Sequence, residues 1–385
     1  MTSTLLTGSG NTFSHSSSIF RKYYEVSADD YSSYWDSIFN GSTFNNNPMN
    51  NGTMSNFGIS LSGFDKWYGG VLSSNGKIYG IPHSSTDILI IDPIANSATR
   101  SSLGANLSGG AKWVGGVLGP DGKIYCIPYD ATDILIIDPI ANSATRSSLG
   151  ASLSGSVKWF GGVLGPNGKI YGIPHSSTDI LIIDPIANSA TRSSLGANLS
   201  GTWKWLGAVL GPDGKIYCIP FNATDILIID PIANSATRSS LGANLSDGAK
   251  WVGGVLGPDG KIYCIPFNAT DILIIDPIAN SATRSSLGAS LSGSVKWISG
   301  ALGADGKIYA TTLTESTILV IDTINNIATK TNFQTSGNSW TGGTMASNGK
   351  IYGIPWGSQS ILSISGSINN IPSINSATSA YINKF

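Results

Sequence analysis

The residue types that most often carry catalysis are scarce in this chain of 385 residues. Its three histidines, His15, His83 and His175, show no metal-ligand spacing. The Gly-Lys pair at 122–123 is followed by isoleucine rather than Ser or Thr, so it does not form a phosphate loop. The sequence therefore predicts no enzyme, no metal and no cofactor. A propeller hydrolase or lyase is the least favoured class of function, because its carboxylate cluster is missing from the pattern.

One recurring position offers flat rings instead, because it is aromatic or histidine in all but one of its occurrences. Its residues are His83, Tyr129, His175, Phe221, Phe267, Leu313 and Trp356. Rings beside Asn and Ser suit a sugar or a loop of a partner protein, since they offer contact area at low entropic cost. We predict that they line a ligand-binding face. The alternative is that each ring only covers the core of its own blade, while the loop sequences change without functional consequence.

Phe64 and Trp203 lie in a second variable loop, which ends at a recurring Lys-Trp pair. We expect this loop to open on the same face and to place an inner circle of lysines there. These lysines are Lys66, Lys112, Lys158, Lys204, Lys250 and Lys296. We interpret Asp87 and its equivalents as partners of the lysines, and Asp92 and its equivalents as partners of the Arg100 series.

A long repeat positions these residues. Its tryptophans are spaced by 46 residues, and by 43 at the last step: Trp67, Trp113, Trp159, Trp205, Trp251, Trp297 and Trp340. Such a period fits a propeller blade or a pair of solenoid helices. Inside one copy, short strand patterns cover 113–118, 123–127, 133–137 and 143–149, with an Asp-Gly turn at 121–122. Four short strands without a helical period predict one blade of a β-propeller.

The fold predicted is all-β, a seven-bladed β-propeller of four-stranded blades at residues 51–366. Residues 52–63 match 144–155, so the chain enters with an outer strand that has no blade before it. The last copy lacks its own outer strand. We therefore predict that residues 52–58 complete the seventh blade, and that residues 367–385 form a tail.

Residues 1–50 lie before the repeat and are predicted to carry one short helix. Its first turn holds Asp29 and Asp30, and its apolar face is spaced as in a helix. That face consists of Tyr31, Tyr34, Trp35, Ile38 and Phe39. A short helix with so much apolar surface is stable only when another surface buries that face. The helix is predicted either to pack against the propeller or to dock a protein partner.

Two stretches of each copy resemble a known class of repeat. The run Asp-Gly-Lys-Ile-Tyr and the later run Ile-Leu-Ile-Ile-Asp-Pro-Ile-Ala-Asn-Ser-Ala-Thr are similar to the blades of YVTN-type and NHL-type β-propellers, and more loosely to kelch repeats. The resemblance covers residues 52–366 and implies the fold. It implies little about function, because such propellers serve as enzymes, adhesins, scaffolds and surface-layer components.

Composition limits the partners. A net charge of −1 gives no electrostatic attraction for nucleic acid or an anionic membrane. No apolar stretch reaches the length of a membrane span, so no membrane insertion is predicted, and the N-terminus lacks the features of a signal peptide. With only 12% charged residues, we predict a non-catalytic binding or structural protein, a receptor-binding or displayed component of a virion or cell surface. The alternative is a carbohydrate-binding lectin that uses the ring residues.

Overall fold

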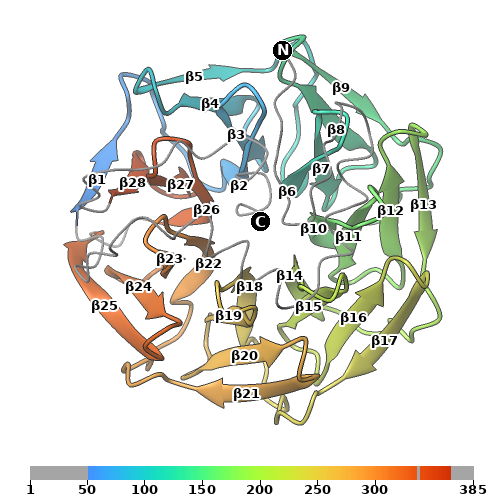
Figure 1. The fold of residues 1–385 in the computed structure, drawn as a ribbon. Coiled ribbons are helices and arrows are strands. Elements are labelled where there is room, and N and C mark those ends of the chain that lie inside the picture. Colours follow the sequence, from blue (N-terminus) through green and yellow to red (C-terminus); the bar gives the residue numbers. More distant parts are fainter. Residues whose placement is uncertain (1–50, 336–338, 366–385) are drawn as a thin grey trace, which may run out of the picture.

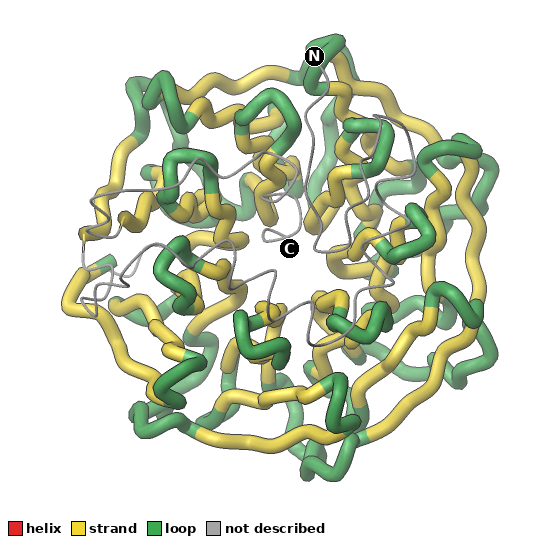
Figure 2. The backbone as a smooth tube through the Cα atoms, viewed as in Figure 1, coloured by secondary structure: helices red, strands yellow, loops and turns green. Residues whose placement is uncertain are grey.

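The computed structural model describes residues 51–335 and 339–365, and across these residues the regular structure is entirely β-strand. The strands form seven four-stranded antiparallel sheets, set around a central axis like the blades of a propeller (Figures 1 and 2). The prediction of an all-β, seven-bladed propeller with four-stranded blades is confirmed. The predicted helix at Tyr31, Tyr34, Trp35, Ile38 and Phe39 and the tail at 367–385 lie outside the described residues. In the described part, no helix could span a membrane.

Equivalent strands repeat from blade to blade. The innermost strands are β2 (Trp67–Leu72), β6 (Trp113–Leu118), β10 (Trp159–Leu164), β14 (Trp205–Leu210), β18 (Trp251–Leu256), β22 (Trp297–Leu302) and β26 (Trp340–Met345). The second strands are β3 (Ile78–Pro82), β7 (Ile124–Pro128), β11 (Ile170–Pro174), β15 (Ile216–Pro220), β19 (Ile262–Pro266), β23 (Ile308–Thr312) and β27 (Ile351–Pro355). The third strands are β4 (Ile88–Asp92), β8 (Ile134–Asp138), β12 (Ile180–Asp184), β16 (Ile226–Asp230), β20 (Ile272–Asp276), β24 (Thr317–Asp322) and β28 (Ile361–Ser365). The outer strands are β5 (Ser97–Ser101), β9 (Ser143–Ser147), β13 (Ser189–Ser193), β17 (Ser235–Ser239), β21 (Ser281–Ser285), β25 (Ile327–Gln334) and β1 (Asn51–Ser55).

The two ends of the described chain meet in the seventh blade. The order of its strands is β1, β28, β27 and β26, and β1 pairs antiparallel with β28, with Gly52 opposite Ile364. The closing segment predicted at 52–58 overlaps β1. A strand from the start of the chain therefore completes a blade made by its end, which fastens the ring.

Glycine lets the innermost strands crowd the axis. A side chain at Gly342 would place its Cβ 2.7 Å from the Cα of Gly69, and one at Gly115 would lie 3.1 Å from the Cα of Gly161. Both Gly342 (φ 73°) and Gly115 (φ 72°) also have positive φ, and the register of β6 shifts between Trp113 and Gly116. Backbone packs directly on backbone here, which only glycine allows.

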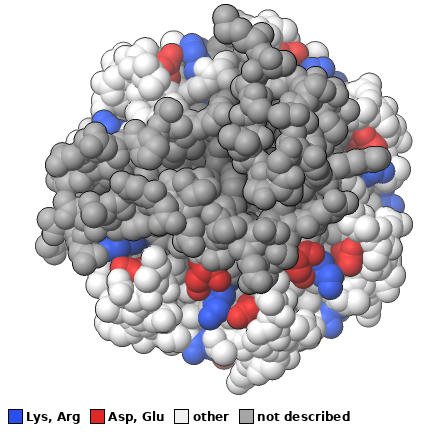
Figure 3. Space-filling view, in the orientation of Figure 1, with Lys and Arg blue, Asp and Glu red and all other residues white. Residues whose placement is uncertain are grey.

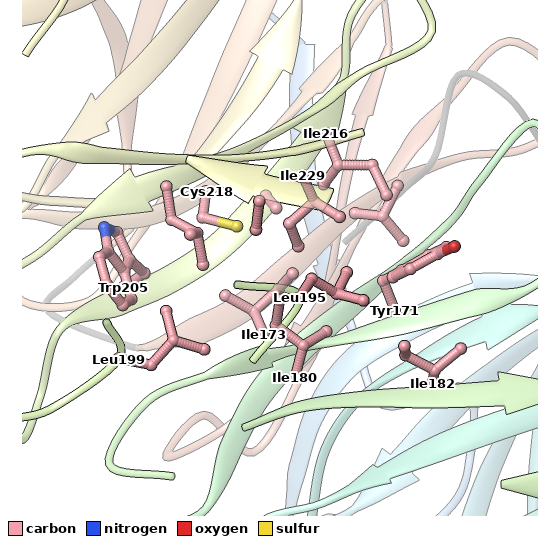
Figure 4. Packing of buried hydrophobic residues seen from close by; sticks show 14 of the residues in the cluster. Tyr171, Ile173, Ile180, Ile182, Leu195, Leu199, Trp205, Ile216, Cys218 and Ile229 are labelled. Carbon is pink, nitrogen blue, oxygen red and sulfur yellow. The ribbon is translucent and has the colours of Figure 1, made fainter. Parts of the chain in front are cut away.

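The apolar core lies between neighbouring blades. In Figure 4, Tyr171 and Ile173 of the third blade pack against Trp205 and Cys218 of the fourth. The Trp205 indole is wholly buried, and its Nε1 donates to the backbone oxygen of Asp225 at 2.9 Å. Every blade carries an equivalent buried tryptophan, so each blade covers the apolar face of its neighbour.

The antiparallel order places the connections at two opposite ends of the axis. Loops from second to third strands, and from one blade to the next, open at one end, which we call the variable face. The turns from first to second and from third to outer strands open at the other end, which we call the hairpin face. The two variable loops noted in the sequence are thereby gathered on one side.

Candidate functional site

Nine rings meet around the axis on the variable face, and we call them the axial aromatic cluster. They are Tyr68, His83, Tyr129, Phe160, His175, Trp203, Phe221, Phe267 and Trp356. Most belong to the loops after the second strands. Tyr68 and Phe160 come from the innermost strands β2 and β10.

The rings form a continuous series of contacts. The centroids of Trp356 and His83 are 4.9 Å apart, and those of His83 and Tyr129 are 6.0 Å apart. The series continues from Tyr129 to His175 at 5.6 Å and from His175 to Trp203 at 4.4 Å. It reaches the fifth blade through Trp203, Phe221 and Phe267, at 6.1 and 5.5 Å. The blades thus share one surface of touching rings, as aromatic pairs prefer.

The cluster has a polar half and an apolar half. Tyr68, His83, Tyr129 and His175, with their hydroxyl and imidazole groups, come from the first three blades. Blades four to six supply an apolar group, against which Tyr68 and Phe160 also pack. This group consists of Leu206, Phe221, Val252, Phe267, Ile298 and Leu313. The scaffold is nearly symmetric, but its axial surface is not.

The imidazole of His175 has an unused atom. The side chain is fully buried, its Nδ1 lies 3.0 Å from the Ser176 hydroxyl, and its Nε2 has no hydrogen-bond partner among the described residues. Burial lowers the pKa of His175 to about 4, and burial likewise lowers the pKa of His83. His175 is therefore neutral at pH 7, with an unpaired nitrogen inside a ring of aromatic groups.

Sequence reasoning missed Tyr68 and Phe160. Both follow the recurring tryptophan directly, in the innermost strand of their blades. The residues at the equivalent positions are Tyr68, Val114, Phe160, Leu206, Val252, Ile298 and Thr341. The sequence did contain a signal for them. Two copies carry an aromatic residue where most others carry an aliphatic one, although the other strand positions barely vary among the copies. The ring of Phe160 lies 5.1 Å from that of Tyr68 and stacks on His175 at 5.9 Å.

Below the rings, the axis narrows to a small apolar cavity of about 30 Å³. Its lining includes Tyr68, Phe160, Val114, Val252 and Ile298, together with glycines of the innermost strands. This volume holds about one water molecule. A ligand larger than that does not fit in this cavity.

The six predicted lysines are not an accessible inner circle, which corrects our expectation. Lys66, Lys112, Lys158, Lys204, Lys250 and Lys296 are all buried. The Nζ of Lys112 donates to the backbone oxygens of Gly109, His83 and Ser85, at 2.6, 2.9 and 3.0 Å. His83 and Ser85 belong to the preceding blade, so the ammonium ties one blade to the next. The other five lysines contact the corresponding backbone oxygens.

These lysines also close the ring. Lys66 of the first blade donates to the oxygens of Trp356 and Ser358 in the seventh, at 2.9 and 3.0 Å. Between blades six and seven the chain has Ser339 in place of lysine, and the hydroxyl of Thr335 donates to the Glu315 oxygen at 3.1 Å. Burial lowers the pKa of each of the six lysines to about 8. They are therefore still charged at pH 7, where the carbonyl acceptors favour the ammonium form.

The ion pairs also differ from those expected. Asp87 pairs with Arg100 at 2.6 Å, and its equivalents pair in the same way. Asp92 is instead 3.5 Å from Lys77 on the hairpin face. The Arg100 guanidinium also lies over the Trp67 ring, 5.3 Å from its centroid. At the rim in Figure 3, acidic and basic side chains lie next to one another rather than in separate patches.

Two predicted residues stand out from the face. The side chain of Phe64 is 81% exposed and that of Trp203 is 45% exposed. Trp203 also has a φ of 52°, a left-handed conformation that is strained for a bulky residue. The equivalent residues of other blades share this conformation, so Trp203 differs from them in its side chain, whose ring lies 4.4 Å from that of His175.

Comparison with known proteins shows the fold. No protein-family model matches the chain, and no curated protein matches it significantly. Among solved structures, a streptogramin B lyase is similar with a TM-score of 0.66 at 18% identity, covering 81% of this chain and 96% of that chain. Virginiamycin B lyase from Staphylococcus aureus gives a TM-score of 0.66 at 17% identity, with 82% and 99% covered. YCF48 bound to a D1 peptide gives a TM-score of 0.60 at 10% identity, with 84% and 97% covered. The YVTN or NHL type of the blades stays a prediction.

These structures correct our expectation that the chain is not an enzyme. Two of the similar structures are lyases built on the same propeller fold, so the fold gives no ground for excluding catalysis. An active site on such a scaffold has to break the symmetry of the blades. The axial aromatic cluster does break it, because Tyr68 and Phe160 occur in only two blades and both described histidines lie in its polar half.

Proposed function

We propose that this protein is a binding protein whose axial aromatic cluster takes up a segment of a protein partner. The observation that carries the proposal concerns the loop position that supplies most of the rings at one end of the axis. The blades are otherwise nearly identical, but at this position the type of side chain changes from blade to blade. Phe64 and Trp203 add exposed apolar surface beside the cluster. A peptide-bound propeller among the similar structures, YCF48, supports a peptide as the class of ligand.

A peptide suits this surface better than a sugar does. The polar residues that follow the rings already accept hydrogen bonds from the next loop: Asp130 Oδ1 from the Val157 amide at 2.6 Å, and Asn222 Oδ1 from the Ala249 amide at 2.7 Å. A sugar needs such groups free, whereas an apolar side chain needs only the rings. A sugar would therefore find fewer free hydrogen-bonding groups here than a lectin site requires.

A displayed peptide library tests this proposal. The full-length protein is immobilised and selected against random peptides, and an enriched peptide is then titrated by calorimetry. We expect Trp203→Ala to weaken the peptide at least about 30-fold, the size of a binding hot spot. The matched control, Ile327→Ser, removes an exposed apolar side chain from the outer strand β25 and should leave affinity unchanged. Equal binding by both variants, or hits on a glycan array with no enriched peptide, would contradict the proposal.

A second candidate is proton-transfer chemistry at the polar half. The observation that favours it is the unpaired Nε2 of His175, next to the Tyr129 ring. In the Staphylococcus aureus lyase, a His→Ala variant bound to quinupristin is catalytically inactive. Incubation of this protein with quinupristin, followed by mass spectrometry, gives the test. Turnover that is lost in His175→Ala would support the candidate, and an unchanged substrate would count against this activity.

We also propose that the propeller is displayed on a virion or cell surface and that residues 1–50 attach it to a protein partner there. The support is compositional, since only 12% of residues are charged. Fractionation of the native source tests it. Recovery in the particle or surface fraction is the expected result, and a free cytosolic monomer would contradict it.

A further inference from the structure

We propose that the hairpin face is an interface through which two copies of this chain stack. Each turn between a third strand and its outer strand exposes one isoleucine, and we call these residues the isoleucine ring. They are Ile94, Ile140, Ile186, Ile232, Ile278 and Ile324, all between 58% and 75% exposed. Because the blades are related by rotation about the axis, the six side chains form a circle on a face remote from the axial aromatic cluster.

The turns hold these isoleucines rigidly. In the first blade, Asp92 Oδ1 accepts from the amides of Ile94 and Ala95, at 3.1 and 2.9 Å. Pro93 is buried on one side of Ile94, and Asn96 takes the left-handed conformation that completes the turn, with a φ of 51°. A side chain presented on so fixed a backbone loses little entropy when it binds.

Hydrogen bonds also join some of the neighbouring turns. The Nδ2 of Asn75 donates to the oxygen of Pro139 in the next blade at 3.2 Å, and that of Asn167 donates to Pro231 at 3.1 Å. Asn348 does the same to Pro93 at 3.0 Å, across the closure of the ring. Three of the turns that carry ring isoleucines are thereby tied to an adjacent blade.

Duplication alone does not explain the ring. The sixth blade has diverged, and its turn reads Asp-Thr-Ile-Asn-Asn at 322–326 where other blades have Asp-Pro-Ile-Ala-Asn. Two of the five residues have changed, but Ile324 is still isoleucine and is 67% exposed. A polar side chain would fit this exposed position equally well, and repeated exposed apolar groups favour association.

A second copy of the chain is the occupant that fits. The six isoleucines can all be covered at once by a surface with the same rotational spacing, and this chain has that surface. A twofold axis perpendicular to the propeller axis brings ring onto ring in an isologous contact. Ion pairs limit the repulsion between the two acidic rings, since Asp92, Asp184, Asp276 and Asp322 are paired with lysines of their own blades at 3.3 to 3.9 Å.

Light scattering of the full-length protein over a concentration series tests this. We expect a mass twice the 40.0 kDa of the chain. The variant in which all six ring isoleucines are serine should be monomeric, and Ile327→Ser, on the outer edge of β25, should still dimerise. A wild-type protein that stays monomeric into the millimolar range would overturn the proposal, and so would a ring variant that stays dimeric.

A cross-link gives a second readout that does not depend on the folding of the multiple variant. Ala141, beside Ile140, is exposed, and the native cysteines at 126, 218 and 264 are buried. All six isoleucines are covered only when the twofold axis passes through the seventh blade of each copy, which sets the second blade of one copy against the fifth blade of the other. Ala279, the equivalent of Ala141 in the fifth blade, is also exposed. The double variant Ala141→Cys/Ala279→Cys should therefore form a covalent dimer under mild oxidation. The matched control, Ser55→Cys on the outer strand β1, is exposed and should not cross-link. Cross-linking of both to the same extent, or of neither, would overturn the proposal.

Discussion

Replacing Lys112 by methionine tests whether the buried lysines hold the blades together. Methionine keeps an unbranched apolar stem but removes the ammonium that contacts Gly109, His83 and Ser85. The His83 oxygen keeps a second donor, the Lys112 amide at 2.9 Å. Gly109 is exposed, so its oxygen can bind water in the variant. The variant therefore leaves one buried carbonyl group, that of Ser85, without the donor that the lysine supplied.

The size of the effect follows from that count. An unsatisfied buried acceptor costs about 1–3 kcal/mol. Part of this is offset because the variant no longer buries a charge, a penalty seen in the lowered pKa of Lys112. We expect a net loss of about 1–2 kcal/mol in the free energy of unfolding, measured by guanidinium denaturation.

The matched control is Lys77→Met on the hairpin face. Lys77 is 43% exposed in its ion pair with Asp92, and such pairs contribute about 0–1 kcal/mol. If Lys112→Met is no more destabilising than Lys77→Met, then the buried lysines do not stabilise the junctions, and our account of the ring is wrong.

Three further predictions concern stability. The pKa of Lys112 is lowered to about 8 from a usual 10.5, so between these pH values the unfolded chain binds more protons than the folded chain. The wild type should therefore gain stability relative to Lys112→Met as pH rises from 8 to 10.5, measured in parallel denaturation series. The side chain of Asn75 donates a hydrogen bond to a proline of the next blade, whereas the carboxylate of Asp121 has no hydrogen to donate. Asn75→Asp should therefore lower the melting temperature and Asp121→Asn should raise it, each by the equivalent of about 1 kcal/mol. Shifts of the same sign would contradict this. Val157 has a φ of 53°, so Val157→Asn should stabilise by about 1 kcal/mol, while Ser156→Asn beside it should do nothing in the same melts.

The fold was predictable because its signals are local. An Asp-Gly turn, a run of Ile and Leu, and a Ser- and Thr-rich edge each lie within a few residues, and the 46-residue period repeats them. The strand positions follow from these patterns without knowledge of distant contacts. The rotation of the blades then places both variable loops on one face.

The surroundings of the lysines were not predictable in this way. Lysine is rarely buried unless it is paired, and the acceptors of Lys112 lie 27 and 29 residues earlier, in another blade. The pairing of Arg100 depended on register, because β5 places Arg100 opposite Leu89. That position is nearer to Asp87, before the strand, than to Asp92 at its end. Charged residues that recur with equal spacing do not reveal which of them will meet.

The two variable loops lie on one face, which favours a binding surface over loops that change without functional effect. Turns on both faces lie at the surface, yet the Asp-Pro-Ile-Ala-Asn turns of the hairpin face are identical in five blades while the ring position differs in kind from blade to blade.

If the rings only cap the core, their order should not matter. His83 and Phe221 are equally buried, at 9% and 8% exposure, so the double exchange His83→Phe/Phe221→His keeps the composition and moves an imidazole into the apolar half. We expect stability within about 1 kcal/mol of the wild type and loss of the peptide selected on the wild-type protein, measured by calorimetry. Unchanged peptide affinity would show that the rings act only as core caps.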